Sequence, residues 1–215
     1  MRDKYSSLAA LKADHRENLD YQIRLLDRWS WATIIAPHGG FIEPGTSALA
    51  RATAGRNYNY FDFQGLRSTA AMDLHVTSTR FRDPALGDLL KRSCTAVSFH
   101  CMGKAGEAVI WLGGLNKDLK AIVLGNLRNA GFSVNPDSPR YRGESVNNVV
   151  NLVRHQGVQL ELSEELIQEL FDGPAFVPGR TSVPTARFDA LTMSMRLSLR
   201  QYRHQQQKVE AELKD

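Results

Sequence analysis

The segment of this chain that most constrains its fold is an almost continuous apolar run, WATIIAPH, at residues 31–38. A strand with so few polar side chains has to be covered on both faces, which is typical of central strands in sheets that lie between layers of helices. Other strand-like segments occur along the chain, and helical segments separate several of them. Strands that alternate with helices predict a single α/β domain with a mixed, largely parallel central sheet flanked by helices.

The expected strands and helices follow from hydrophobic periodicity and from capping residues. Strands are predicted at residues 20–26, 31–38, 57–63, 73–79, 95–100, 108–114 and 158–162. Helices are predicted at residues 44–54, 84–93, 115–132 and 163–171. The polar, turn-rich residues 133–145 are predicted to form a surface loop.

The chain divides into three parts. Residues 1–171 contain all of these strands and helices, and they are predicted to form the catalytic domain. Residues 172–185, DGPAFVPGRTSVPT, are rich in proline and are predicted to form a loop or flap. Residues 186–215 are predicted to extend the same domain as a C-terminal helix with one apolar face. That face contains Leu191, Met195 and Leu199.

Composition argues against several classes of protein. Cys94 and Cys101 are the only cysteines, too few for a disulfide framework, so we expect reduced thiols. The N-terminal residues MRDKYSSLAALKADHREN lack the apolar centre of a signal peptide, and no segment has the length and apolarity of a membrane span. We therefore expect a cytoplasmic protein without a membrane partner. The net charge of +4 suits an anionic substrate and weak nucleic-acid contact equally.

Two histidines and a glutamate occur close to the ends of predicted strands. His38 ends the apolar strand, two glycines that permit a tight reversal follow it, and Glu43 comes at the entrance to the next helix. His100 ends another strand. Carboxyl ends of strands border the ligand crevice of an open α/β sheet, so these side chains can meet there. Two histidines, one glutamate and an open fourth position are typical of a catalytic zinc site.

The same residues also have a simpler interpretation. A spacing of five residues between His38 and Glu43 arises often by chance, and a glutamate is favoured at any helix start. His100 alone is more often a hydrogen-bonded polar residue at a strand end. Spacing by itself therefore leaves the metal site as one of two hypotheses.

A hydrolytic zinc site also needs a general base for its water, and Glu161 is the candidate. The apolar residues of the strand at 158–162 share one face, whereas Gln159 and Glu161 share the other. Glu161 thus comes at the end of a late strand and points away from the apolar set. The alternative is that it is the solvent-facing residue of an edge strand.

Six blocks of the sequence occur in the order seen in one enzyme family. They are APHGGFIEPGTSALARA, YFDFQG, DLHVTSTRF, SFHCMG, WLGGLN and NNVVNLVRHQGVQLELS. Over roughly residues 5–171 the chain thereby resembles the phage-type poly-γ-glutamate hydrolases, and a chance match across six ordered blocks is implausible. The resemblance implies a compact, zinc-carboxypeptidase-like α/β fold.

The resemblance also implies an activity, which is zinc-dependent cleavage of γ-glutamyl amide bonds in poly-γ-glutamate, a polymer of bacterial capsules. It assigns His38, Glu43 and His100 as the ligands of one zinc ion per chain, and Glu161 as the general acid–base. The expected partner is then an anionic polyglutamate or a glutamyl peptide. A phage-encoded member would reach such a polymer on host lysis.

A polymer with one free α-carboxylate per residue requires cationic or amide donors in the cleft that binds it. Arg80 is the first candidate for this contact, followed by Arg154 and Asn148. His75 is a candidate for donating to the oxyanion or for orienting a ligand. Each of the four has the alternative of an ordinary surface residue or a strand-end residue bonded to backbone.

Two departures from the family pattern limit what the resemblance implies. Cys101 and Met102 follow His100 where the family has a glycine, and residues 166–171 lack the arginine expected after QLELS. We expect metal binding to survive these changes, whereas substrate preference can differ. Cys101 itself is not expected to bind the metal, because neighbouring residues on a strand point to opposite faces.

Two other functions remain open. The same ligands would serve a zinc amidohydrolase that acts on small acyl-amino acids or cell-wall peptides. A non-enzymatic, nucleic-acid-associated phage protein would instead use the basic residues of the C-terminal helix, which are Arg187, Arg196, Arg200 and Arg203. Acidic residues follow these arginines closely, so a solvated or oligomerising helix explains the segment better, and we expect no nucleic-acid binding.

Overall fold

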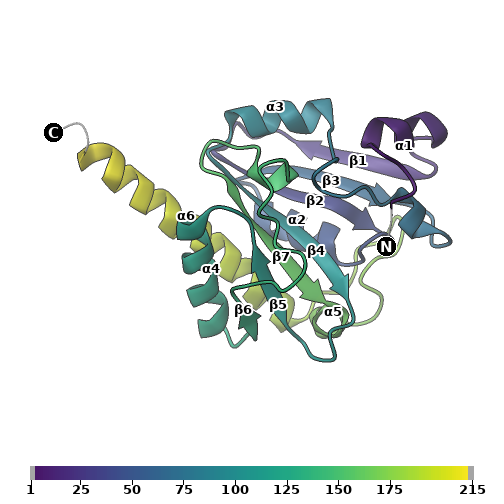
Figure 1. The fold of residues 1–215 in the computed structure, drawn as a ribbon. Helices are drawn as coiled ribbons and strands as arrows, with labels where there is room; N and C mark the ends of the chain where they lie inside the picture. The colour runs from purple at the N-terminus through teal and green to yellow at the C-terminus, as the bar shows by residue number, and fades with distance from the viewer. Residues whose placement is uncertain (1–2, 213–215) are drawn as a thin grey trace.

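The computed structural model describes residues 3–212, whose strands form one seven-stranded sheet in the order β1-β3-β2-β4-β7-β5-β6 (Figure 1). Residues 1–2 and 213–215, at the ends of the predicted catalytic domain and of its helical extension, lie outside the described part. The strands are β1 (Tyr21–Leu26), β2 (Ala32–Gly40), β3 (Asn59–Gly65), β4 (Thr95–Gly103), β5 (Ile110–Gly113), β6 (Val134–Asn135) and β7 (Gly157–Ser163).

Helices lie on both faces of this sheet. The α-helices are α1 (Leu8–Asp14), α2 (Thr46–Ala54), α3 (Pro84–Arg92), α4 (Lys117–Asn129), α5 (Glu164–Leu170) and α6 (Ala186–Glu212). Two short 3-10 helices are η1 (Ala71–Leu74) and η2 (Val149–Asn151). Four strand pairs are parallel, and the pairs β1–β3 and β5–β7 are antiparallel. The predicted α/β class with a mixed, largely parallel sheet is confirmed.

β2 is the central strand that the apolar run predicts. All nine of its residues are buried, and it pairs in parallel with β3 on one side and β4 on the other. Ile34 and Ala36 pack in the core that contains residues of α2, α4 and α6, whereas Ile35 packs in the core that contains residues of α1 and α3. Each large apolar side chain buried in this way stabilises the fold by about 1.5–3 kcal/mol.

β2, β4 and β7 run in the same direction, so their carboxyl ends lie at one edge of the sheet. His38 lies near that end of β2, and His100 lies near that end of β4. In the register between β4 and β7, His100 is directly opposite Glu161. Hydrogen bonding between strands thus positions side chains that are far apart in the sequence at the same edge.

The predicted strand at residues 73–79 is wrong. The chain forms η1 there and continues as an irregular segment outside the strands of the described sheet. Leu74 and Val76 are buried while His75 and Thr77 are partly exposed, so packing against the rest of the protein produces an alternation like that of a strand. His75 is consequently the residue that caps η1 and does not end a strand.

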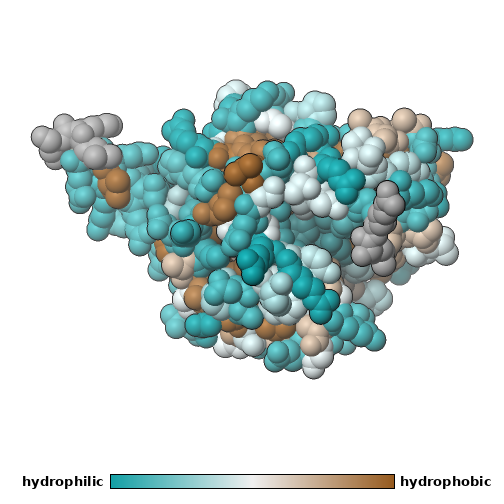
Figure 2. All heavy atoms as spheres, viewed as in Figure 1, coloured by the Kyte–Doolittle hydropathy of each residue, from teal (hydrophilic) through white to brown (hydrophobic). Residues whose placement is uncertain are grey.

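The C-terminal helix α6 packs its first half on the body of the protein and projects beyond it with its second half (Figure 1). The predicted apolar face is confirmed, since Leu191, Met195 and Leu199 are buried in the core that α2 and α4 share. Figure 2 shows that the projecting end is almost entirely hydrophilic. None of the helices within residues 3–212 combines the length and apolarity required to cross a membrane.

Two methionines of α6 form a matched pair for testing this packing. Met195 is fully buried, whereas the side of the helix with Met193 is open, and Met193 is 67% exposed. Met195→Ala should lower the free energy of unfolding by about 2–5 kcal/mol, because it removes buried apolar surface and leaves a cavity. Met193→Ala should change it by less than about 0.5 kcal/mol. Equilibrium unfolding in denaturant measures both, and equal effects would contradict the docking of α6.

Candidate metal centre

The turn after β2 brings His38 and Glu43 together. His38 Nδ1 lies 2.8 Å from Glu43 Oε1, and both side chains are buried. The main chain closes the turn, because the Glu43 N–H donates to the carbonyl of His38 at 2.8 Å. Gly40 has a φ of 68°, in the left-handed region that glycine adopts without steric cost. The two glycines after His38 thus serve the reversal that the sequence predicts.

Gly39 is required for a different reason, which is close approach to β3. A Cβ at this position would overlap Asp62 Oδ1 and Ser47 Oγ. Ser47 Oγ accepts from the Gly40 N–H at 2.9 Å and donates to Asp62 at 3.0 Å. Burial raises the pKa of Asp62 to about 6, although hydrogen bonds from three neighbouring side chains oppose that rise. This buried polar cluster holds the turn against the sheet.

His100 completes the group from the neighbouring strand. Its Nδ1 lies 3.2 Å from His38 Nδ1 and 3.3 Å from Glu43 Oε2. The Cys101 N–H donates to Glu43 Oε2 at 3.1 Å, so β4 also fixes the orientation of the carboxylate. The structure therefore brings all three predicted metal ligands into mutual contact.

The hydrogen-bond pattern defines which of these atoms has a lone pair. His38 Nε2 lies 2.9 Å from the carbonyl oxygen of Val76, which can only accept, so Nε2 carries the hydrogen. In the neutral ring Nδ1 then has a lone pair, and that lone pair faces a carboxylate oxygen of Glu43. The repulsion between them requires a positive charge, either a second proton on the imidazole or a metal ion.

The donor set fits zinc. Two imidazole nitrogens and one carboxylate, with a fourth position left for water, are the ligands of many catalytic zinc sites. A ligating histidine normally donates its other ring N–H to a carbonyl or carboxylate, as His38 does to Val76. Cys101 packs against the apolar core that contains residues of α2, α4 and α6, and burial raises the pKa of its thiol to about 12.

The two buried glutamates of this edge have opposite electrostatic environments. Burial raises the pKa of Glu43, but the attraction of His38 and His100 and their hydrogen bonds outweigh it and hold that pKa well below its usual range. Burial, together with the negative charge of Glu43, raises the pKa of Glu161 well above its usual value. This environment favours the carboxylate form of Glu43, whereas Glu161 is suited to take up and release a proton.

Glu161 lies inside the sheet, since β7 is between β4 and β5. It is buried, which contradicts the alternative of a solvent-facing residue on an edge strand. Gln159 Nε2 donates to Glu161 Oε1 at 2.7 Å, so the two residues share a face as their spacing predicts. The predicted base thus lies directly beside the predicted metal ligand His100.

His75 lies on the other side of His38. The two ring centroids are 4.0 Å apart, and His75 Nε2 is 3.9 Å from Glu43 Oε1. His75 Nδ1 is 2.8 Å from Asp3 Oδ1. Burial and the charge of His38 lower the pKa of His75 to about 4. In the neutral ring Nδ1 donates to the carboxylate, so Nε2 has the lone pair, and this tautomer does not support donation to an oxyanion.

Asp3 is a residue of this edge that sequence reasoning missed. It accepts from the Thr77 N–H at 2.8 Å and from His75, and its other neighbour is Arg80 Nη2 at 3.4 Å. No motif indicates it, because its partners are more than seventy residues away along the chain. Arg80 is thus close to the predicted site, with its side chain 51% exposed.

The other two substrate-binding candidates lie elsewhere. Asn148 is buried, caps η2 and donates to Gln159 at 2.9 Å. Because Gln159 in turn donates to Glu161, Asn148 supports the base indirectly. Arg154 is exposed, and its N–H donates to the carbonyl of Ser93, which precedes β4. Arg154 therefore lies at the amino ends of the parallel strands, opposite the metal ligands, and this location does not support a contact with substrate.

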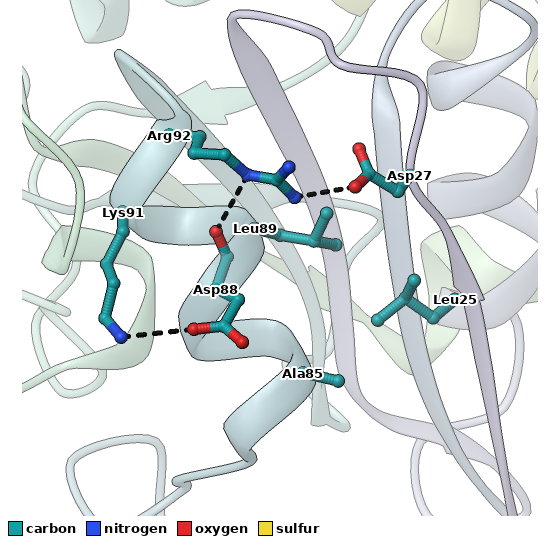
Figure 3. Close-up of a pocket in the computed structure, with 7 residues that line it drawn as sticks. All are labelled: Leu25, Asp27, Ala85, Asp88, Leu89, Lys91 and Arg92. Carbon is teal, nitrogen blue, oxygen red and sulfur yellow. Dashed lines mark hydrogen bonds and ion pairs between the residues drawn. The ribbon is translucent and has the colours of Figure 1, made fainter.

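A surface groove between β1 and α3 is separate from this centre (Figure 3). Its charged side chains neutralise one another, since Arg92 pairs with Asp27 at 2.6 Å and Lys91 pairs with Asp88 at 3.1 Å. None of the predicted site residues lines it. The groove offers no convergent catalytic groups, so the carboxyl edge of the sheet is the candidate site.

Comparison with curated proteins identifies relatives in Bacillus subtilis strain 168. The SPbeta prophage-derived UPF0714 protein YoqZ is 35% identical over 173 residues, which cover 79% of this chain and 62% of YoqZ. This chain thus spans less than two thirds of the length of that relative. The UPF0714 protein YndL is 30% identical over 197 residues, which cover 90% of this chain and 76% of YndL.

Two solved structures superpose over nearly the whole chain. A bacteriophage poly-gamma-glutamate hydrolase superposes with a TM-score of 0.88 and 26% identity, covering 94% of this chain and 99% of the other. A zinc-free, apo structure of YndL superposes with a TM-score of 0.84 and 30% identity, covering 93% and 98%. The sequence profile described as poly-gamma-glutamate hydrolase matches residues 5–193. This chain therefore belongs to the poly-gamma-glutamate hydrolase family.

Proposed function

We propose that this protein is a zinc-dependent hydrolase that cleaves the γ-glutamyl amide bonds of poly-γ-glutamate. The observation that supports metal binding is the convergence of His38 Nδ1, His100 Nδ1 and the Glu43 carboxylate, which lie 2.8–3.3 Å from one another. A lone pair of His38 there faces a carboxylate oxygen. The description of the YndL structure as zinc-free supports zinc as the ion. The name of the bacteriophage relative supports the polymer as substrate.

One zinc ion per chain, held by His38, Glu43 and His100, is part of the proposal. When bound, zinc supplies Lewis acidity toward the scissile carbonyl and lowers the pKa of water toward about 7. Glu161 takes a proton from the attacking water and returns it to the nitrogen of the departing amine. The water oxygen ends on the carbonyl carbon, the C–N bond breaks, and the products are a carboxylate and an amine.

Two further residues are proposed to act beside the ligands. Arg80 is exposed at the rim and suited to bind a free α-carboxylate of the polymer. The ring of His75 lies against that of His38 with a tilt of 36°, and Asp3 fixes its tautomer, so we assign His75 the orientation of that ligand. Asn148 is assigned to the support of Glu161 and not to substrate.

Other substrates define the main alternative. A zinc amidohydrolase that acts on small acyl-amino acids or cell-wall peptides would use the same ligands and the same base. Membership in a hydrolase family argues against the non-enzymatic alternative. The choice between the two hydrolases depends on the residues that contact the substrate, and the arginine expected after QLELS is absent from this chain.

Removal of a ligand tests the metal centre. Purified protein should bind about one zinc ion per chain, and zinc at a hundredfold excess over its Kd should raise the free energy of unfolding by about 2.7 kcal/mol. His38→Ala and His100→Ala should lose both effects, whereas His204→Ala, at an exposed position on α6, should keep them. Elemental analysis and thermal unfolding are the measurements, and equal zinc binding by all three variants would contradict the assignment.

Replacement of the base separates metal binding from turnover. Glu161→Gln should retain zinc, since the glutamine keeps the shape of the side chain and is not a ligand. Its kcat should fall by about 10²–10⁴-fold, because water is no longer deprotonated. Steady-state kinetics and metal analysis on the same preparation check this. Wild-type turnover in the variant would remove Glu161 from the proposed role.

The substrate is tested by offering the polymer and its competitors to one preparation. Poly-γ-glutamate should be shortened in a chelator-sensitive reaction, because each of its residues offers a free carboxylate that Arg80 is suited to bind. N-acyl amino acids and cell-wall peptides should be hydrolysed at least about tenfold more slowly in kcat/KM, an expectation of about 1.4 kcal/mol in differential binding. Size-exclusion chromatography and amine release measure the two. Faster turnover of the small substrates would favour the alternative.

A further inference from the structure

Gln159 is hydrogen-bonded through both ends of its side-chain amide. It lies on β7 two residues before Glu161 and is 4% exposed. Its Nε2 donates to Glu161 Oε1 at 2.7 Å and to the carbonyl of Tyr141 at 3.1 Å. Its Oε1 accepts from Asn148 Nδ2 at 2.9 Å. A buried amide with three partners does not rotate without losing several hydrogen bonds.

The orientation of this amide is determined by its neighbour. Asn148 Oδ1 accepts from the Val150 N–H at 3.1 Å, so the Asn148 NH₂ group has to face Gln159. Gln159 Oε1 must therefore face Asn148, and its NH₂ group must face Glu161. The Val150 N–H thus fixes the orientation of the Asn148 amide, which fixes that of the Gln159 amide. The Gln159 NH₂ group consequently faces Glu161.

One oxygen of the base is held by this chain of hydrogen bonds. Glu161 Oε1 accepts from Gln159, whereas Glu161 Oε2 takes part in no hydrogen bond within residues 3–212. This hydrogen bond restrains the rotation of the carboxylate. The other oxygen keeps its lone pairs for a proton from water, as a general base requires.

The same chain of hydrogen bonds reaches the loop at residues 136–148. Tyr141 belongs to this loop, and its carbonyl is one of the acceptors of Gln159. The loop is fixed from two other sides, since the Gly114 N–H donates to the carbonyl of Arg142 at 2.8 Å and Asn151 Nδ2 donates to the carbonyl of Ser145 at 2.9 Å. Gln159 therefore bonds the base to a loop whose backbone is rigidly supported.

We propose that Gln159 is a positioning residue that holds Glu161 in its catalytic orientation, with Asn148 setting the direction of the Gln159 amide. This role rests on the proposed function, because it presupposes that Glu161 is the base. Gln159 does not touch the reacting atoms. It acts by presenting one oxygen of Glu161 to water and by keeping the carboxylate tied to the loop at residues 136–148.

Gln159→Met tests this role, since methionine has a similar length but no donor. Its kcat on poly-γ-glutamate should fall about ten- to a hundredfold, the range expected for a hydrogen bond to a charged group. KM should change by less than about threefold, and zinc content should be unchanged. Gln22→Met, on the edge strand β1, is the matched control and should keep the wild-type kcat.

A double variant distinguishes positioning from a general structural effect. In the Glu161→Gln background, Gln159→Met should cause no further loss of kcat, because its only route to the reaction is through Glu161. A further tenfold loss in that background would contradict the inference. So would a kcat within twofold of wild type in the Gln159→Met single variant.

Asn148→Asp gives a second test that does not alter Gln159. The aspartate still caps the Val150 N–H but replaces the donor toward Gln159 with an acceptor, so the amide should turn and present its oxygen to Glu161. We expect a loss of kcat similar to that of Gln159→Met. An unaltered kcat in Asn148→Asp would contradict the proposed role of Asn148 and Gln159, even if Gln159→Met failed to fold.

The wild-type enzyme distinguishes the two ways in which this account can fail. A zinc-loaded wild type that leaves poly-γ-glutamate intact contradicts the proposed function. Cleavage by the wild type that survives Gln159→Met contradicts the positioning role alone. In the first case, NMR of the Gln159 side-chain amide still tests its hydrogen bond to Glu161, since its protons should exchange slowly in wild type and faster in Glu161→Ala. Equal exchange in the two would contradict it.

Discussion

The structure depends on the meeting of His38, Glu43 and His100, in which a lone pair of His38 faces the carboxylate of Glu43. His38 uses its Nε2 hydrogen on a backbone carbonyl, so its Nδ1 faces Glu43 without a hydrogen, and His100 approaches both. Such an arrangement is unfavourable in a buried site unless a positive charge lies among the three groups. A bound cation removes the repulsion, and a metal ion also supplies the chemistry that amide hydrolysis requires.

Much of the remaining fold holds these groups in place. Parallel pairing places the ends of β2, β4 and β7 at one edge, and the register sets His100 opposite Glu161. The glycine turn after β2 reaches Glu43 and is supported through Ser47 by the buried carboxylate of Asp62. The base is supported separately by a chain of amides. Each reactive group thus has its own rigid support, which is what catalytic positioning requires.

The sequence predicts the parts that depend on local periodicity and on the rule that ligands bind at carboxyl ends of strands. The central strand, the His38–Glu43 turn, His100 and the face of Glu161 all follow from these patterns. It does not predict contacts made by distant segments. Asp3 meets His75 only through tertiary folding, and the alternation around His75 comes from packing that a period of two cannot distinguish from a strand. Arg154 lies at the amino ends of the parallel strands, a location that no local pattern indicates.

X-ray absorption at the zinc edge of the loaded protein tests the central claim most directly, because it measures the ligands of the ion. We expect nitrogen and oxygen ligands at about 2.0–2.2 Å with scattering from two imidazole rings, and no sulfur at about 2.3 Å. The signal of one imidazole should disappear in His100→Ala, whereas His75→Ala should retain both. A sulfur ligand, or an unchanged spectrum in His100→Ala, would contradict the proposed centre.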